Sequence, residues 1–226
     1  MQDLDLSPFW LTLKLAAITT TILLIIGLPL AAWIGKGRTP ARALVETLIA
    51  MPLVLPPSVL GFYLLLAFSP QYTFGRWLID TFNLKLVFSF PGLVIGSVLF
   101  SLPFMVQPVQ AAFANLPRSL TEASYTLGKS RLTTFWRVEL PNVKPAIIVG
   151  TIMAFAHTVG EFGVVLMIGG NIPGVSRVMS IAIYHEVEQL NYDTAHLYSA
   201  ILFGFSFAVV LVVNLVKRRG HLIQTL

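Results

Sequence analysis

Five apolar stretches, each close to the length that crosses a lipid bilayer, constrain this chain more than any other feature. They cover roughly residues 11–34, 44–68, 92–113, 146–168 and 197–216. A hydrocarbon core about 30 Å thick requires about 20 mainly apolar residues in a helix that spans it. Because lipid offers backbone groups no hydrogen-bond partner, a spanning segment of this kind must be helical. The sequence therefore predicts a single all-α membrane domain with five transmembrane helices.

Composition supports a membrane protein. Hydrophobic residues make up 56% of the chain and charged residues 11%, whereas about a quarter of the residues in soluble domains are charged. Cysteine is absent, which excludes a disulfide framework and a thiolate metal site. Asp3 and Asp5, rather than a basic region, precede the first apolar stretch. That stretch is also too long for a signal peptide, so we interpret it as a retained span.

The basic residues predict the orientation of the chain. Of 15 Lys and Arg residues, 11 follow the first span, lie between the third and fourth spans, or follow the fifth. Cytoplasmic loops carry an excess of Lys and Arg. We therefore expect the N-terminus outside and the C-terminus in the cytoplasm, and we attribute the net charge of +5 to orientation rather than to nucleic-acid binding. Of two shorter outside segments, 73–90 is expected to lie at the membrane interface, and 177–190 is expected to lie on the surface or to dip partly into the bundle.

The polar segment 119–141 lies on the predicted cytoplasmic side. Ser119 and Glu122 fit a capping box, which begins a helix, and Gly128 stands where a helix commonly ends. Pro141 is expected to end the segment before the fourth span. The helix would carry one apolar face, formed by Leu120, Ala123 and Leu127. Such a helix either rests on anionic lipid headgroups or docks into a groove of a partner.

One pattern covers residues 122–141: Glu-Ala-Ser, three residues, Gly, nine residues, Val-Glu-Leu-Pro. It resembles the EAA loop of ABC importer permeases, which reads Glu-Ala-Ala, three residues, Gly, nine residues, Ile, any residue, Leu-Pro. In that family the loop forms the coupling helix, which inserts into the ATP-binding subunit. The resemblance implies that the following residues couple the chain to an ATPase: Glu122, Ala123, Ser124, Gly128, Leu140 and Pro141.

The resemblance extends over most of the chain. Residues 51–66, 160–163 and 169–188 are similar to the molybdate transporter permeases of the oxyanion-importer group, although His157 stands where many members have Arg. This implies a type I ABC importer permease fold in the bacterial inner membrane. It also implies alternating access driven by two cytoplasmic ATP-binding subunits and a periplasmic molybdate-binding protein. Because five helices enclose no adequate pore alone, we expect a homodimer with the pathway on its two-fold axis.

No catalytic site is expected in this chain. Gly128, Lys129 and Ser130 supply the second half of a P-loop, but Ala123 stands where its first glycine is required. His185 and Glu186 begin a zinc-protease motif whose second histidine is missing. The chain is therefore predicted to be a transport subunit without a metal or cofactor of its own. The resemblance places ATP and Mg²⁺ in the partner subunit.

Two groups of residues are candidates for a translocation pathway or gate. His157 and Glu161 lie near the middle of the fourth predicted span, where a charged group costs at least about 2.5–3.5 kcal/mol, and their spacing would let the side chains meet. They form either a structural pair, with Glu161 capping a helix break after Gly160, or part of the pathway. The second span holds prolines that interrupt the helical hydrogen bonds, and freed carbonyls are tolerated where they line a cavity or pack in protein. The candidates there are Pro56, Pro57 and Ser58.

Three alternatives remain open from the sequence. The same machinery would serve sulfate or tungstate. A proton-coupled secondary carrier would use His157 and Glu161. A passive channel would need no partner.

Overall fold

A computed structural model describes residues 4–37 and 39–223, and within these ranges the chain forms helices and no strand. The helices are α1 (Ser7–Gly35), α2 (Pro40–Val54), α3 (Pro57–Phe68), α4 (Thr73–Phe82), α5 (Phe90–Ala114), α6 (Arg118–Thr126), α7 (Arg131–Thr134), the π-helix η1 (Phe135–Glu139), α8 (Leu140–Gly160), α9 (Gly163–Gly169), α10 (Met179–Glu188) and α11 (Tyr192–Ile223).

The structure confirms the predicted all-α architecture with up to five spans. Four helical segments are long and apolar enough to cross a membrane: Ser7–Gly35, Phe90–Ala114, Arg131–Gly160 and Tyr192–Leu211. The fifth candidate span is the pair α2 and α3, which are long and apolar enough together and are bent by 114° at the break between them. The prolines explain the bend, because Pro56 caps α3 and Pro57 begins it, and neither has an N–H to continue the hydrogen-bond ladder of α2.

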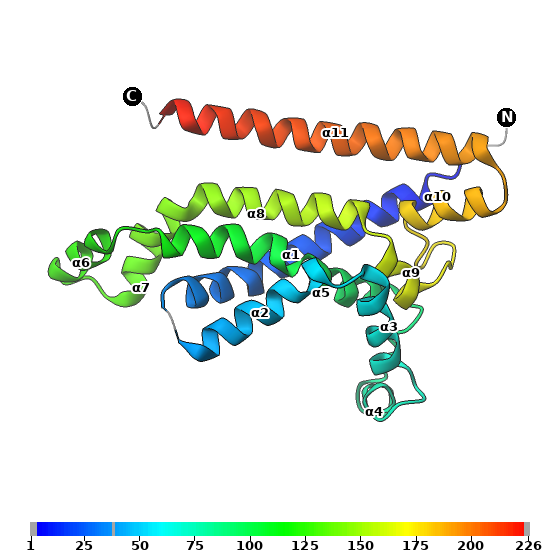
Figure 1. Cartoon of the computed structure of the whole chain (residues 1–226), viewed down its shortest axis with the longest axis horizontal. Coiled ribbons are helices and arrows are strands. Elements are labelled where there is room, and N and C mark those ends of the chain that lie inside the picture. The colour runs from blue at the N-terminus through cyan, green and yellow to red at the C-terminus, as the bar shows by residue number, and fades with distance from the viewer. Residues whose placement is uncertain (1–3, 38, 224–226) are drawn as a thin grey trace.

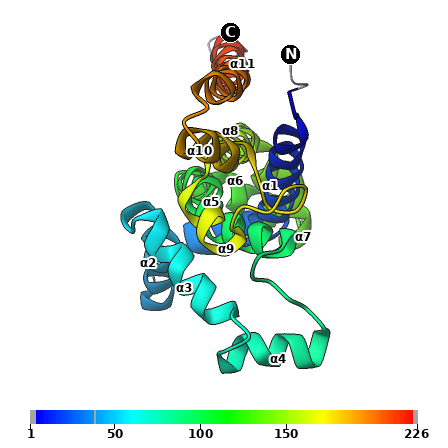
Figure 2. The ribbon, with the colours of Figure 1, turned by 90° about the vertical axis from the view of Figure 1, so that its right-hand side faces the viewer.

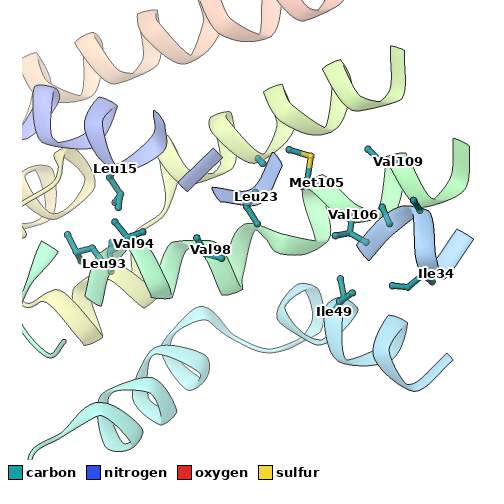
Figure 3. Packing of buried hydrophobic residues seen from close by; sticks show 14 of the residues in the cluster. Leu15, Leu23, Ile34, Ile49, Leu93, Val94, Val98, Met105, Val106 and Val109 are labelled. Carbon is teal, nitrogen blue, oxygen red and sulfur yellow. The ribbon is translucent and has the colours of Figure 1, made fainter. Parts of the chain in front are cut away.

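Helices α1, α5 and α8 pack side by side and form the centre of the bundle (Figure 1). Their shared core contains fully buried side chains from α1 and α5, including Leu15, Leu23, Met105, Val106 and Val109 (Figure 3). Burial of each such side chain contributes roughly 1.5–3 kcal/mol in a soluble reference. In lipid, much of the stabilisation comes instead from close van der Waals packing between the helices. The bundle is therefore built around the first, third and fourth spans.

Helices α2, α3 and α4 lie on one side of this centre, and α11 lies on the other (Figure 2). Most side chains of α11 are exposed along residues 192–211, and it packs chiefly on α10 and α8. Helix α4 stands apart and exposes Phe74, Trp77 and Phe82, as expected of an interfacial segment. Helix α10 buries Met179, Ile181 and Ala182, so this segment dips into the bundle.

The predicted bounds of the fourth span, 146–168, are wrong at both ends. The helix runs without interruption from Arg131 through η1 to Gly160 and then breaks before α9. Pro141 does not end the preceding segment, because it lies in the first turn of α8, where a missing N–H is tolerated. The π-helical turn just before it has already shifted the hydrogen-bond register.

Different short helices lie at the two ends of the bundle. Helices α6 and α7 lie at the end where α1 and α11 finish, whereas α9 and α10 lie at the end where α1 begins (Figure 1). The chain thus crosses the bundle an odd number of times, as the sequence predicts.

Candidate functional site

The first candidate site is the segment around α6. The predicted capping box is absent from it: the N-cap is Pro117, which makes no side-chain cap, and the helix begins at Arg118. Ser119 is therefore already inside the first turn, past the position from which its hydroxyl could cap the helix.

The predicted end of α6 at Gly128 is confirmed. Gly128 has a φ of +72°, the left-handed conformation that favours glycine. The N–H of Lys129 donates to the carbonyl of Ser124 at 3.1 Å, and that of Gly128 donates to Tyr125 at 2.9 Å. A Cβ atom at position 128 would meet nothing within 4 Å. The backbone conformation, rather than lack of space, therefore requires glycine here.

Helix α6 rests on its neighbours through a polar side chain. Ser124 is the buried residue of α6, and its hydroxyl forms a 2.8 Å hydrogen bond with the hydroxyl of Thr134 in α7. The predicted apolar face points away from the chain: Ala123 and Leu120 are exposed, and Leu127 is 76% exposed. This face is available to another molecule.

A cavity of about 890 Å³ lies beside α6. Glu122 lines it together with Arg118 and Arg131, and the far wall comes from the end of α1 and from Glu139. Leu140 and Pro141 follow Glu139 directly and begin α8. The predicted coupling residues therefore lie in α6, just after it, and at the start of α8, which reaches the second site.

The second candidate site lies where α8 ends. The Nδ1 atom of His157 is 2.9 Å from the hydroxyl of Ser101 in α5, which in turn bonds the hydroxyl of Thr158 at 2.9 Å. The imidazole also stacks on Phe104, with ring centroids 4.0 Å apart, and contacts Phe100 at 4.9 Å. These contacts hold the ring against α5.

His157 and Glu161, whose spacing would let their side chains meet, both line one cavity but form no hydrogen bond with one another. Glu161 follows the last residue of α8 and has an extended ψ of 134°, so the one-turn spacing of a helix does not apply to it. Its backbone carbonyl accepts a 2.6 Å hydrogen bond from the hydroxyl of Ser180. The side chain is 4% exposed, and neither carboxylate oxygen has a partner among the residues that the structure describes.

A cavity of about 690 Å³ brings together four of the five predicted pathway residues, Pro57, Ser58, His157 and Glu161, with aromatic and glycine neighbours. Pro56 lies just before α3 as its N-cap. Gly163, just after the break that follows α8, allows α3 to lie close to that break, because a Cβ at Gly163 would be 2.7 Å from the Cβ of Pro57. Among the residues that the structure describes, no Lys or Arg lines this cavity. The cavity therefore presents a hydroxyl group, an imidazole and aromatic rings beside the carboxyl group of Glu161.

Sequence reasoning missed Ser101 and Thr158. Single hydroxyls are common in spanning helices, and they usually bond their own helix. The available signal was the spacing of Ser97 and Ser101, which places two polar side chains on one face of the third span.

Comparisons with known proteins agree with this architecture. Residues 27–219 match the model of the family described as binding-protein-dependent transport system inner membrane component. The chain is 44% identical to the molybdenum transport system permease protein ModB of Azotobacter vinelandii, over 93% of each chain. It is 35% identical to ModB of Escherichia coli (strain K12), covering 81% of this chain and 80% of that protein. It is 32% identical to the sulfate transport system permease protein CysT of the same strain, covering 84% and 69%.

Two solved structures share the fold. One is a bacterial ABC transporter involved in the import of the acidic polysaccharide alginate, with a TM-score of 0.79 and 17% identity over 97% of this chain and 80% of that one. The other is the MetNI methionine ABC transporter in an inward-facing conformation, with a TM-score of 0.72 and 16% identity over 97% and 99%.

Proposed function

Because this chain belongs to the family of inner membrane components of binding-protein-dependent transport systems, we propose that it is the permease subunit of an ATP-driven molybdate importer. The observation that supports molybdate as the substrate is the 44% identity to ModB over nearly the whole of both chains. Identity to the sulfate permease CysT is lower, at 32%. The chain is a transport component, and in this proposal separate subunits bind Mg²⁺ and ATP and hydrolyse the nucleotide.

The proposed assembly contains two copies of the chain, two ATP-binding subunits and a periplasmic molybdate-binding protein. The exposed apolar face of α6 supports a docking contact with the ATP-binding subunit, since an amphipathic helix binds a groove through such a face. The excess of basic residues at the α6 end supports a cytoplasmic location for it. The N-terminus is then periplasmic and the C-terminus cytoplasmic. The binding protein would meet the opposite end, near α10.

In the proposed mechanism, ATP binding draws the two ATP-binding subunits together and moves α6. The movement passes through the Ser124–Thr134 hydrogen bond and η1 into α8, which is continuous as far as Gly160. The break after Gly160 transmits it to the cavity lined by Ser58, His157 and Glu161. This changes the side on which the cavity is open, which is alternating access.

Two observations support other candidates. The similarity to CysT favours sulfate, and tungstate has the same charge and shape as molybdate. The buried carboxylate of Glu161, which lacks a partner among the described residues, favours a proton-coupled carrier, because intramembrane carboxylates commonly serve proton relays.

Uptake into proteoliposomes tests the proposal. The chain is reconstituted with its ATP-binding subunit, and the molybdate-binding protein is added outside. We expect molybdate uptake that requires ATP and the binding protein, and that tungstate inhibits more strongly than sulfate. Uptake that stops with a protonophore while ATP is maintained would support the carrier instead. Uptake without any partner would support a channel.

A further inference from the structure

An ion pair joins the ends of two helices, α1 and η1, that are 103 residues apart in sequence. Lys36, the residue after α1, donates from its Nζ to Oε2 of Glu139, the last residue of η1. Glu139 is 5% exposed, although it belongs to a polar segment whose side chains are mostly exposed. A buried carboxylate is costly unless it is paired, so this contact determines how η1 meets α1.

Two aromatic rings complete the contact. The Nζ of Lys36 lies 5.5 Å from the ring centroid of Phe113 in α5 and 5.0 Å from that of Phe135 in η1. The two rings are nearly parallel, with centroids 6.1 Å apart. An ammonium group within about 6 Å of an aromatic face is attracted to it. One side chain therefore connects the ends of α1 and α5 to the start of the fourth span.

The π-helix places Glu139 in this position. The N–H of Leu140 donates to the carbonyl of Phe135, five residues back, so one extra residue is inserted into the turn. An α-helix advances about 100° per residue, and an inserted residue therefore changes the direction in which residue 139 points. π-helical turns within α-helices often occur at functional sites.

The same turn carries α6. Helix α6 packs chiefly on α7 and η1, and the Ser124–Thr134 hydrogen bond fixes it there. The 890 Å³ cavity separates much of α6 from the end of α1, and both Lys36 and Glu139 line it. The end of α1 is itself held against α5, since a Cβ at Gly35 would be 2.6 Å from the carbonyl oxygen of Gln110.

We propose that the Lys36–Glu139 pair is a second coupling link, which transmits movement of α6 to α1 in addition to α8. This inference rests on the proposed function, because it requires α6 to be moved by an ATP-binding subunit. Lys36 and Glu139 are positioning residues in this account and touch neither substrate nor nucleotide. Loss of the pair would leave α6 docked but would let η1 move without α1.

Charge exchange in the complete transporter tests the proposal. The variants are Glu139→Gln, Lys36→Met and the double exchange Lys36→Glu/Glu139→Lys. The control is Glu46→Gln, another carboxylate-to-amide change on the same side of the molecule, where Glu46 accepts a 2.6 Å hydrogen bond from Gln110. For each complex, molybdate uptake, ATP hydrolysis and retention of the ATP-binding subunit are measured.

We expect each single variant to retain the ATP-binding subunit and to lose roughly fivefold or more in uptake per ATP hydrolysed, the low end of coupling between distant sites. The double exchange should recover most of that ratio, and the control should keep it. Single variants with the wild-type ratio would overturn the inference, as would failure of the exchange to recover it. Lower yield with an unchanged ratio in the recovered complex would show a purely structural role and also overturn it. A wild-type complex without ATP-dependent uptake would instead overturn the proposed function.

Discussion

Three hydrogen bonds link the imidazole of His157, the hydroxyls of Ser101 and Thr158, and the carbonyl of Ala154. The hydroxyl of Thr158 donates to the carbonyl of Ala154 at 2.9 Å, so its oxygen is left to accept from Ser101. Ser101 has then used its only proton and must accept from Nδ1 of His157. In this arrangement a neutral His157 carries its proton on Nδ1, and its other nitrogen is an acceptor that does not attract an anion.

Replacing Ser101 tests the importance of this arrangement. In Ser101→Ala, Nδ1 loses its acceptor and the imidazole is free to turn away from Phe104. A hydrogen bond contributes about 0.5–1.5 kcal/mol, and 1.4 kcal/mol corresponds to tenfold, so molybdate uptake should fall by up to about tenfold. Thr151→Val is the control, because the Thr151 hydroxyl bonds a carbonyl of its own helix. Equal uptake by both variants would show that the orientation of His157 does not matter.

Glu161→Gln isolates the charge of the second candidate residue at nearly constant volume. We expect impaired uptake with the ATP-binding subunits still attached, because the side chain lies at the break of the fourth span and far along the chain from α6. Uptake and co-purification are measured on the same membranes. Dissociation of the complex would indicate a purely structural role, and wild-type uptake would contradict a role in either the gate or the packing.

The sequence predicts the local features of single helices better than the contacts between helices. The end of α6 at Gly128 and the break at Pro56 follow from backbone chemistry that is present in the residues themselves. The burial of Glu139 could not be predicted, because a glutamate in a basic loop normally lies in solvent and its partner is 103 residues away. The bounds of the fourth span were missed for a related reason: the polar first turns of the helix, residues 131–139, resemble a loop in hydropathy.

Two substitutions test the coupling role of helix α6. A side chain at a left-handed position costs roughly 1–2 kcal/mol, so Gly128→Val should distort the end of α6 without unfolding the spans. Glu122→Lys reverses an exposed charge on the same helix. Both variants should remain in the membrane as dimers, yet bind the ATP-binding subunit less tightly or hydrolyse ATP without uptake.

The matched control for Gly128→Val is Gly174→Val. Gly174 also has a positive φ, +71°, and open space around its Cβ position, but it lies between α9 and α10 at the other end of the bundle. Its replacement imposes similar backbone strain away from α6. If Gly128→Val and Glu122→Lys both transport at wild-type rates, α6 does not couple this chain to an ATPase.

Both candidate sites depend on one orientation of the chain in the membrane. Coupling requires α6 in the cytoplasm, where ATP is available, and the end that carries α9 and α10 must then face the periplasm. The structure places the finish of α11 at the α6 end and α4 beyond the far end of α3 (Figure 1).

A reporter fused after Arg219 should therefore be cytoplasmic, and one inserted near Asp80 in α4 should be periplasmic. Alkaline phosphatase, active only in the periplasm, and a fluorescent protein, active in the cytoplasm, give opposite signals at each position. Three spans lie between these two points, namely α5, the helix Arg131–Gly160 and α11, so the two reporters are expected on opposite sides. Reporters on the same side would contradict the five-span arrangement and with it the assignment of α6 to the ATP-binding subunit.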